Sequence, residues 1–271
     1  MDGRSEDAGA TAGRMQASAG DLRRFFPHRI ARPGARYRLF CFPPAGAGAT
    51  VFRAWSGLMA QAADVCAFEL PGHQTRFNEP LARSVDEVAQ EFIAASVHLR
   101  DRPFILLGHS LGAMIAAQAA HLLARSGAGP AALVVVGCPA PTMNARNRAI
   151  AHLDRPAFLR ALADLGGLPE DVLANSELVD VLLPALRAGC RMAEEWRAGA
   201  GRRFAAPLPC PIGAISGRAD PYVTADELDA WRHHGTGAAV IRQAAGDHFF
   251  LQSDPEPVLT LVGDLARLSL S

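Results

Sequence analysis

A serine, an acid and a histidine that follow one another along this chain are the residue types needed to hydrolyse an acyl bond. The serine is Ser110, within the pentapeptide GHSLG at 108–112, which has the G-x-S-x-G spacing of a nucleophile elbow. An apolar run at 104–107 precedes it, and an alanine-rich helical pattern follows. This context predicts a sharp strand-to-helix turn that strains the serine backbone and exposes its hydroxyl.

The acid and the base of this chemistry are predicted to follow two later strands. Asp220 ends the segment SGRAD, and His248 lies in GDHFF directly after the last strand candidate. The order serine, acid, histidine is the order of hydrolases with this kind of elbow. Asp226 and Asp229 remain alternative acids, although they fall within a helical pattern where a solvated role is the simpler interpretation. We expect His248 to be the base.

A glycine-rich turn, FPPAGAGA at 42–49, follows the first strand candidate. Small residues let backbone N–H groups approach a ligand oxygen, so the N–H groups of Ala45 and Leu111 are candidates for an oxyanion hole. A plain tight turn before a helix is the alternative interpretation. The sequence contains no P-loop, no HExxH and no G-x-G-x-x-G after a first strand. We therefore expect no cofactor and no metal.

The string LGHSL at 107–111 also resembles the site at which carrier proteins receive a phosphopantetheine arm on a serine. A carrier domain is a small helical bundle. Here the serine follows an apolar run typical of a buried strand, and the nucleophile elbow is therefore the favoured interpretation.

The elements that must position these residues alternate between short apolar runs and helical patterns. Near-continuous apolar runs are typical of strands buried on both faces. The alternation predicts an α/β fold with a mostly parallel, doubly wound sheet. The strand candidates are Tyr37–Phe42, Val65–Leu70, Pro103–Leu107, Ala132–Gly137, Ile212–Ser216 and Ala239–Arg242. The helical patterns cover Ser84–Leu99, Leu111–Arg125, Thr224–His234 and Pro257–Leu268.

One stretch, about 146–200, interrupts this alternation and predicts several short helices, punctuated by glycines at 166–167 and by Pro169 and Pro184. It follows the fourth major strand, so it should sit above the sheet edge where α/β sites form. A lid over the site is the favoured interpretation, and an extra packing layer is the alternative. Candidates for an apolar lining, or for the lid's own core, are Leu182, Leu186 and Met192.

Composition narrows the class of protein. The 271 residues are 49% hydrophobic and 20% charged, with a formal net charge of zero, which gives no electrostatic argument for a nucleic-acid partner. No apolar run reaches the roughly 18–20 residues that span a bilayer, so we expect no membrane partner. Residues 1–34 lack a secretory apolar core and are expected to form a flexible extension. The five scattered cysteines are typical of thiols in a reducing cytoplasm.

The assembled segments resemble the type II (external) thioesterases of polyketide and nonribosomal peptide biosynthesis, within the α/β-hydrolase superfamily. The resemblance covers the chain from about Tyr37 to Leu268, and it includes the helical insertion, which general esterases do not share. Its marks are LFCFPPAGAGA at 39–49, FELPGHQTR at 68–76, LLGHSLGAM at 106–114, LADLGGLPEDVL at 162–173, LLPALRAGCRMAEEW at 182–196, SGRADP at 216–221 and GDHFFL at 246–251.

This resemblance implies a single α/β-hydrolase domain at 35–271 that acts as a free-standing enzyme. Its substrates would be acyl or peptidyl carrier proteins, whose phosphopantetheine arms it clears of stalled or aberrant acyl groups. The family's nucleophile, acid and histidine correspond to Ser110, Asp220 and His248. A carboxylester hydrolase, a product-releasing thioesterase and a hydrolase-fold binding module without turnover remain alternatives.

Three positions depart from the family pattern. Pro44 stands where a histidine is frequent, His73 where an arginine is frequent, and Gly189 where an aspartate is frequent. These departures concern contacts with the substrate or the carrier and leave the three catalytic candidates in place.

Overall fold

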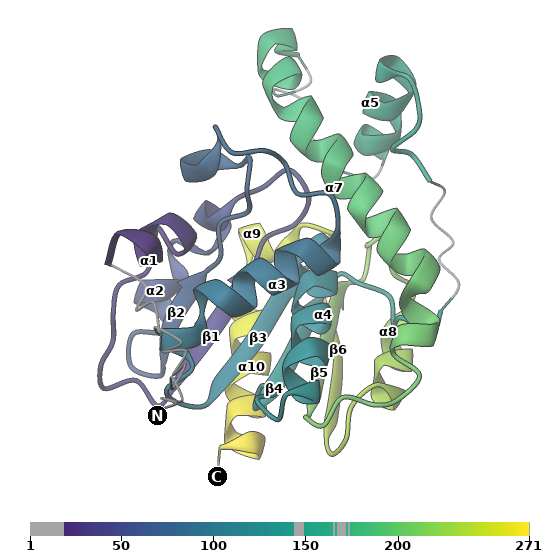
Figure 1. Cartoon of the computed structure of the whole chain (residues 1–271). Helices are drawn as coiled ribbons and strands as arrows, with labels where there is room; N and C mark the ends of the chain where they lie inside the picture. The colour runs from purple at the N-terminus through teal and green to yellow at the C-terminus, as the bar shows by residue number, and fades with distance from the viewer. Residues whose placement is uncertain (1–18, 144–148, 165, 167–171, 173, 271) are drawn as a thin grey trace, which may run out of the picture.

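The computed structural model describes residues 19–143, 149–164, 166, 172 and 174–270. Six parallel strands form one sheet in the order β2-β1-β3-β4-β5-β6, with helices on both faces (Figure 1). The expected α/β fold is confirmed. The strands are β1 (Tyr37–Phe42), β2 (Ala63–Ala67), β3 (Phe104–His109), β4 (Ala132–Val136), β5 (Ile212–Gly217) and β6 (Ala239–Ala244).

Alternation of side chains along the strands divides the apolar residues between the two faces of the sheet. In β1, Phe40 and Phe42 belong to one core cluster, whereas Leu39 and Cys41 belong to a second cluster on the opposite face. Every residue of β1 to β5 is buried, as the near-continuous apolar runs predict for parallel strands covered on both sides. The edge strand β6 is partly exposed.

Helices cover both faces. Residues of α3, α4 and α8 pack with Phe40, and residues of α2, α9 and α10 pack with Leu39. The α-helices are α1 (Ala19–Phe25), α2 (Trp55–Leu58), α3 (Val85–Ala95), α4 (Leu111–Arg125), α5 (Arg155–Asp164), α7 (Ser176–Arg203), α8 (Ala225–Asp229), α9 (Phe250–Ser253) and α10 (Glu256–Ser269). The 3-10 turns are η1 (Ala49–Phe52), η2 (Gln74–Arg76), η3 (Val97–Leu99) and η4 (Ala230–His233).

The strand order reverses between β1 and β3, because the chain runs from β1 out to the β2 edge and then returns to β3. Such a reversal opens a crevice at the carboxyl ends of the strands, where sites form in α/β sheets. Ser110 follows β3, Asp220 follows β5 and His248 follows β6. The three candidate residues therefore lie at one edge of the sheet.

The second strand differs in extent from its prediction. It spans Ala63–Ala67 and does not continue to Leu70. The Phe68 N–H still donates to a β1 carbonyl at 2.9 Å, but the Glu69 N–H donates to the Phe25 carbonyl at 2.9 Å. The chain leaves the sheet at this point because its backbone changes partner, and a run of apolar letters does not reveal that change.

The segment between β4 and β5 contains α5 and the long helix α7, whose upper part projects with α5 beyond the sheet (Figure 1). The prediction that Pro184 separates short helices is wrong, because Pro184 lies inside α7, a continuous helix of 28 residues. A proline removes one backbone hydrogen bond, and here apolar packing on both sides of it maintains the helix. Residues 167 and 169 of the expected punctuation lie outside the described residues.

Helix α5 and the first part of α7 share a small apolar cluster of Phe158, Leu162 and Leu186, against which Leu182 packs. This lid cluster contains none of the buried residues of the two sheet clusters. The second part of α7 packs differently, since Met192 and Trp196 belong to the Phe40 cluster. One helix therefore joins two packing units.

The N-terminal segment packs on the body of the protein from α1 onward. Phe26 is 2% exposed and joins the Phe40 cluster, and the Phe25 ring stacks on the Phe68 ring with centroids 6.0 Å apart. Residues 1–18, which hold most of the extension expected to be flexible, lie outside the described residues.

Candidate active site

Ser110 lies in the turn between β3 and α4 with φ 54° and ψ −115°. A positive φ strains a residue with a side chain, and the Ser110 N–H holds this turn by donating to the Val136 carbonyl at 2.8 Å. A methyl group at Gly108 would overlap the Gly112 carbonyl, and one at Gly112 would overlap the Phe42 carbonyl. Only glycine permits these approaches, which explains both glycines of GHSLG.

His248 and Asp220 are paired. Asp220 Oδ2 lies 2.9 Å from His248 Nδ1, and Asp220 Oδ1 accepts a hydrogen bond from the Tyr222 N–H at 2.8 Å. The Asp220 side chain is 0% exposed and the His248 side chain is 3% exposed. A buried carboxylate held in this way fixes the imidazole with its proton on Nδ1 and leaves Nε2 as an acceptor.

The loop that carries His248 is supported by a second histidine. His109 Nε2 lies 2.8 Å from the His248 carbonyl oxygen, so it donates in the neutral tautomer. Burial, together with the nearby His248, lowers the pKa of His109 to about 3, which keeps this ring neutral. The Tyr222 ring also contacts the His248 ring, with the two centroids 4.3 Å apart.

Ser110 and His248 face a common cavity with a volume of about 790 Å³. No hydrogen bond joins Ser110 Oγ to His248 among the described residues, and such catalytic contacts commonly tighten only when substrate is bound. The cavity lies between the loops that carry Ser110 and His248, helix α7, the segment 149–153 and α5. Its lining is Pro44, Ala45, Ser110, Leu111, Ala149, Ile150, His152, Leu153, Ala161, Leu162, Asp164, Leu186, Gly189, Cys190, Ala193, Glu194, Arg197, Tyr222, His248 and Phe249.

Ala45 and Leu111, the oxyanion candidates, both line this cavity. Neither backbone N–H has an acceptor within the part of the chain that the structure describes. Helix α7 lies directly against them, because a methyl group at Gly189 would stand 2.6 Å from Ala45 Cβ and 3.4 Å from Leu111 Cδ2. A residue larger than glycine at 189 would push α7 away from this loop.

Glu69 fixes the far end of the glycine-rich loop. Its Oε1 accepts a hydrogen bond from the Ala49 N–H at 3.2 Å, and its Oε2 lies 3.5 Å from the Thr75 hydroxyl. The side chain is fully buried, and burial raises the pKa of Glu69 to about 7. The loop that carries Ala45 is therefore tied to a carboxyl group that titrates near neutrality.

The three lid candidates have different positions. Leu186 lines the cavity, whereas Leu182 packs in the lid cluster. Met192 is 4% exposed and lies in the Phe40 cluster, so it does not line the cavity. Periodicity alone could not separate them, because all three occur at helical spacing.

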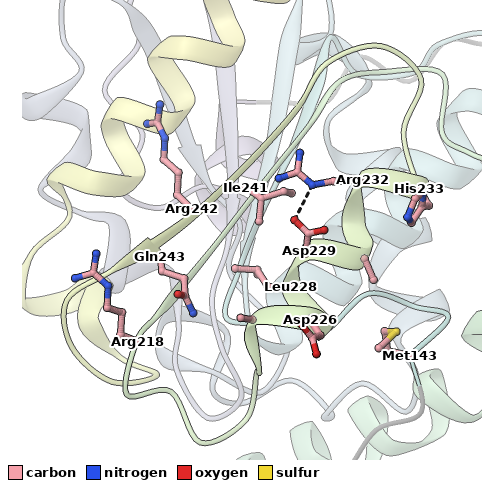
Figure 2. A pocket seen from close by; sticks show the side chains of 12 residues that line it. Met143, Arg218, Asp226, Leu228, Asp229, Arg232, His233, Ile241, Arg242 and Gln243 are labelled. Carbon is pink, nitrogen blue, oxygen red and sulfur yellow. Dashed lines mark hydrogen bonds and ion pairs between the residues drawn. The ribbon is translucent and has the colours of Figure 1, made fainter.

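Figure 2 shows a second pocket, of about 770 Å³, against β6 and α8. It holds Asp226 and Asp229, the alternative acids. Both are exposed, and Asp229 Oδ1 accepts a hydrogen bond from Arg232 Nε at 2.6 Å. Neither carboxylate bonds to His248 in the described part of the chain, and the acid partner of this histidine is Asp220.

Two residues of α7 that sequence reasoning did not single out hold the cavity wall. Glu194 Oε1 accepts hydrogen bonds from the Ile150 N–H at 2.8 Å and the Ala151 N–H at 3.1 Å. Arg187 Nη1 donates to the Ala151 and Leu153 carbonyls, both at 2.6 Å. Their separation of seven residues places them on one face of a continuous helix. Recognising one long helix in the sequence would have placed both residues on one face, but it would not have identified their backbone partners.

Among the described residues, no group of three or more His, Cys, Asp or Glu side chains could hold a metal ion. Within the same residues, no helix is long and apolar enough to cross a membrane.

Residues 37–265 match the family model described as "Thioesterase domain". The chain belongs to the thioesterase family. Thioesterase PikA5 of Streptomyces venezuelae is 34% identical over 245 residues, which cover 90% of this chain and 84% of PikA5. The protein named linear gramicidin dehydrogenase LgrE, of Brevibacillus parabrevis, is 33% identical over 84% of this chain and 87% of its own.

The solved structure of the type II thioesterase BorB, from the borrelidin biosynthetic cluster, superposes with a TM-score of 0.78. The two sequences are 33% identical, and the match covers 88% of this chain and 95% of BorB. The resemblance to type II thioesterases that the motifs indicated is therefore confirmed. Family membership supports hydrolysis of acyl thioesters as the activity.

Proposed function

We propose that this protein is a serine thioesterase that hydrolyses acyl thioesters from the phosphopantetheine arm of carrier proteins, with Ser110 as nucleophile, His248 as base and Asp220 as the acid that orients it. One observation carries the proposal. A strained serine and a histidine paired at 2.9 Å with a fully buried carboxylate face the same cavity. Nucleophilic acyl transfer requires this arrangement of nucleophile, base and orienting acid.

In the proposed mechanism, His248 Nε2 accepts the Ser110 proton while Ser110 Oγ attacks the thioester carbonyl carbon. Asp220 stabilises the imidazolium that forms, and the N–H groups of Ala45 and Leu111 bind the oxyanion. The carbon–sulfur bond then breaks, and His248 returns the proton to the leaving thiolate. In the second half, His248 activates a water that attacks the acyl-serine ester, which releases a carboxylic acid and restores Ser110.

The carrier-bound substrate is supported by the context of the relatives. BorB is a type II thioesterase of a biosynthetic cluster, and a relative from Aneurinibacillus migulanus, 31% identical, is named gramicidin S biosynthesis protein GrsT. An acyl or peptidyl carrier protein is the partner that presents a thioester in such pathways. The proposed role is removal of aberrant or stalled acyl groups.

The segment 146–200 is proposed to act as a lid within a single domain at 35–271. In its favour, α5 and α7 bound the cavity opposite the catalytic loops, and exclusion of water there would favour attack by Ser110 over side reactions. All five cysteines are free thiols, which supports the reducing cytoplasm as the location.

LgrE is named a dehydrogenase, an activity that needs a bound dinucleotide, and this chain offers little support for one. The loop after β1 reads PPAGAGA, without the G-x-G-x-x-G spacing that cradles a pyrophosphate. A carboxylester hydrolase and a product-releasing thioesterase share the proposed triad, so only substrates can separate them. A binding module without turnover has no need of the buried Asp220–His248 pair.

The test compares release rates from acylated carrier proteins, simple esters and long product-like thioesters. The proposal expects kcat/KM to be highest for carrier-bound acyl groups and expects a fluorophosphonate probe to label Ser110. Preference for simple esters would replace it with the esterase alternative. Absence of both labelling and hydrolysis would leave the binding module.

A further inference from the structure

The cavity has chemically different ends along α7. Leu186, at one end, lies beside the apolar side chains Leu153 and Leu162. Arg197 lines the cavity eleven residues further along the helix, which at 1.5 Å per residue is about 16 Å away. A substrate in this cavity therefore meets apolar side chains at one end, next to the polar residues His152 and Asp164, and a guanidinium at the other.

Arg197 has an unused hydrogen-bonding capacity. Its Nε is buried and has no hydrogen-bond acceptor. Glu194, the acid one turn before it, is bonded to the backbone N–H groups of the 150–151 segment instead. A buried donor without a partner is costly and needs an explanation. A ligand oxygen in the cavity would provide its acceptor.

Arg197 lines the cavity together with Tyr222 and His248. Burial raises the pKa of Tyr222, and the positive charge of Arg197 opposes that rise. The Tyr222 ring in turn contacts the His248 ring, with centroids 4.3 Å apart and the ring planes tilted by 40°. In acyl transfer the leaving group departs beside the histidine, because the histidine protonates it. Arg197 therefore faces the part of the substrate that leaves as the thiol.

We propose that Arg197 binds an amide carbonyl of the pantetheine arm and thereby orients the substrate, with its acyl chain toward Leu153 and Leu162. The inference rests on the proposed thioesterase function and specifies how that site distinguishes the two halves of its substrate. The pantetheine arm carries two amide groups on the sulfur side of the thioester. Each amide oxygen is an acceptor of the kind that a guanidinium donor lacks here.

The packing of α7 matches this division of the substrate. Near Arg197, Trp196 Nε1 donates to Gln118 Oε1 of α4 at 3.2 Å, and Arg203 Nη1 donates to the same oxygen at 3.4 Å. These bonds attach the second part of α7 to the body. The apolar end belongs instead to the lid cluster. The arm thus meets a fixed partner, while the acyl chain meets a wall that can adjust to different lengths.

The experiment uses three butyryl thioesters that share one acyl group and differ in the thiol: pantetheine with two amides, N-acetylcysteamine with one, and ethanethiol with none. Arg197→Leu is expected to lower kcat/KM for the pantetheine thioester about 10- to 100-fold, mainly through KM, as expected for one hydrogen bond to a charged donor. The ethanethiol thioester should be unaffected. Arg197→Lys should restore part of the loss.

Arg191→Leu is the matched control, because Arg191 lies on the same helix and is exposed outside the cavity; its kinetics should equal those of the wild type. A measurement without turnover is the dissociation constant of S-methylpantetheine, determined by isothermal titration calorimetry, which Arg197→Leu should raise by a similar factor. If Arg197→Leu lowers kcat/KM for the N-acetylcysteamine thioester, Arg197 binds the amide nearest the sulfur. If that thioester is unaffected, Arg197 binds the distal amide.

Equal loss for all three thiols, or no loss for any, would overturn the inference. If the loss depended on whether the acyl group is succinyl or butyryl, and not on the thiol, Arg197 would bind the acyl group. That result would overturn the inference as well. If the wild type hydrolysed none of these thioesters, the proposed function itself would be rejected. Binding of S-methylpantetheine would still test Arg197 in that case.

Discussion

Replacing Asp220 by asparagine separates the catalytic work of this residue from its structural work. The change keeps the size of the side chain and the Oδ1 acceptor that receives the Tyr222 N–H at 2.8 Å. It replaces the second oxygen, which lies 2.9 Å from His248 Nδ1, by an amide N–H₂ donor. The imidazole must then accept at Nδ1, which moves its proton to Nε2. In that tautomer Nε2 cannot accept the Ser110 proton.

The expected magnitude follows from this exchange of tautomers. Loss of the correct tautomer and of imidazolium stabilisation lowers kcat by about 10⁴-fold, or roughly 5–6 kcal/mol of transition-state stabilisation. The fold should lose only about 1–2 kcal/mol, because the buried side chain keeps two hydrogen bonds. Asp220→Asn should therefore be folded and almost inactive.

The assay measures kcat with a carrier-bound or pantetheine thioester and the free energy of unfolding by urea titration. Asp229→Asn is the matched control, since Asp229 is exposed and bonded to Arg232 in the pocket of Figure 2. Its activity should stay within about twofold of the wild type, because surface changes of this kind have small effects. If Asp226→Asn or Asp229→Asn were crippling while Asp220→Asn stayed active, the assignment of the acid would be refuted.

Three further predictions concern other parts of the structure. Ser110→Ala should lower kcat by about 10⁴–10⁶-fold with the fold intact, and near-normal turnover would reject Ser110 as nucleophile. Gly112→Ala should destabilise the protein by about 3 kcal/mol or more, because its methyl group would overlap the Phe42 carbonyl; Gly57→Ala, with no atom within 4 Å of the added methyl, is the control, and equal unfolding free energies would contradict the packing argument. The pKa of Glu69 is raised by burial from 4.5 to about 7, so the native state binds its proton more tightly than the unfolded chain, and stability is lost as pH rises from about 4.5 to 7. Glu69→Gln should therefore raise the free energy of unfolding by roughly 1–3 kcal/mol at pH 8, seen as a higher melting temperature, and by much less at pH 5. An equal gain at the two pH values would show that the charge of Glu69 is not the cause of the stabilisation.

Sequence reasoning succeeded where a local pattern has one physical solution. Continuous apolar runs predict buried parallel strands, and all residues of β1 to β5 are buried. The spacing of GHSLG implies an elbow, and Ser110 has the positive φ that such a turn requires. Leu111–Arg125 forms a helix with the predicted bounds, since an elbow defines its start.

Reasoning from the sequence failed where tertiary contacts decide the outcome. Pro184 is a helix breaker by propensity, yet α7 passes through it. The roles of Glu69, Arg187 and Glu194 depend on backbone groups far away in sequence, which no local spacing encodes. These polar residues shape the cavity from outside the catalytic motifs, and only the folded arrangement identifies them.

The division of α7 between two apolar clusters has a consequence for evolutionary divergence. The lid cluster of Phe158, Leu162 and Leu186 shares no buried residue with the clusters that hold the sheet. Leu186 is coupled to the body because it lies against Gly46. Substitutions at Phe158 and Leu162 need no compensating change beneath the sheet, because uncoupled sites affect stability independently. In the proposed thioesterase, such substitutions would change the acyl end of the cavity and leave Ser110, Asp220 and His248 in place. Repacking of this small cluster would then give a new acyl preference without a change in the proposed chemistry.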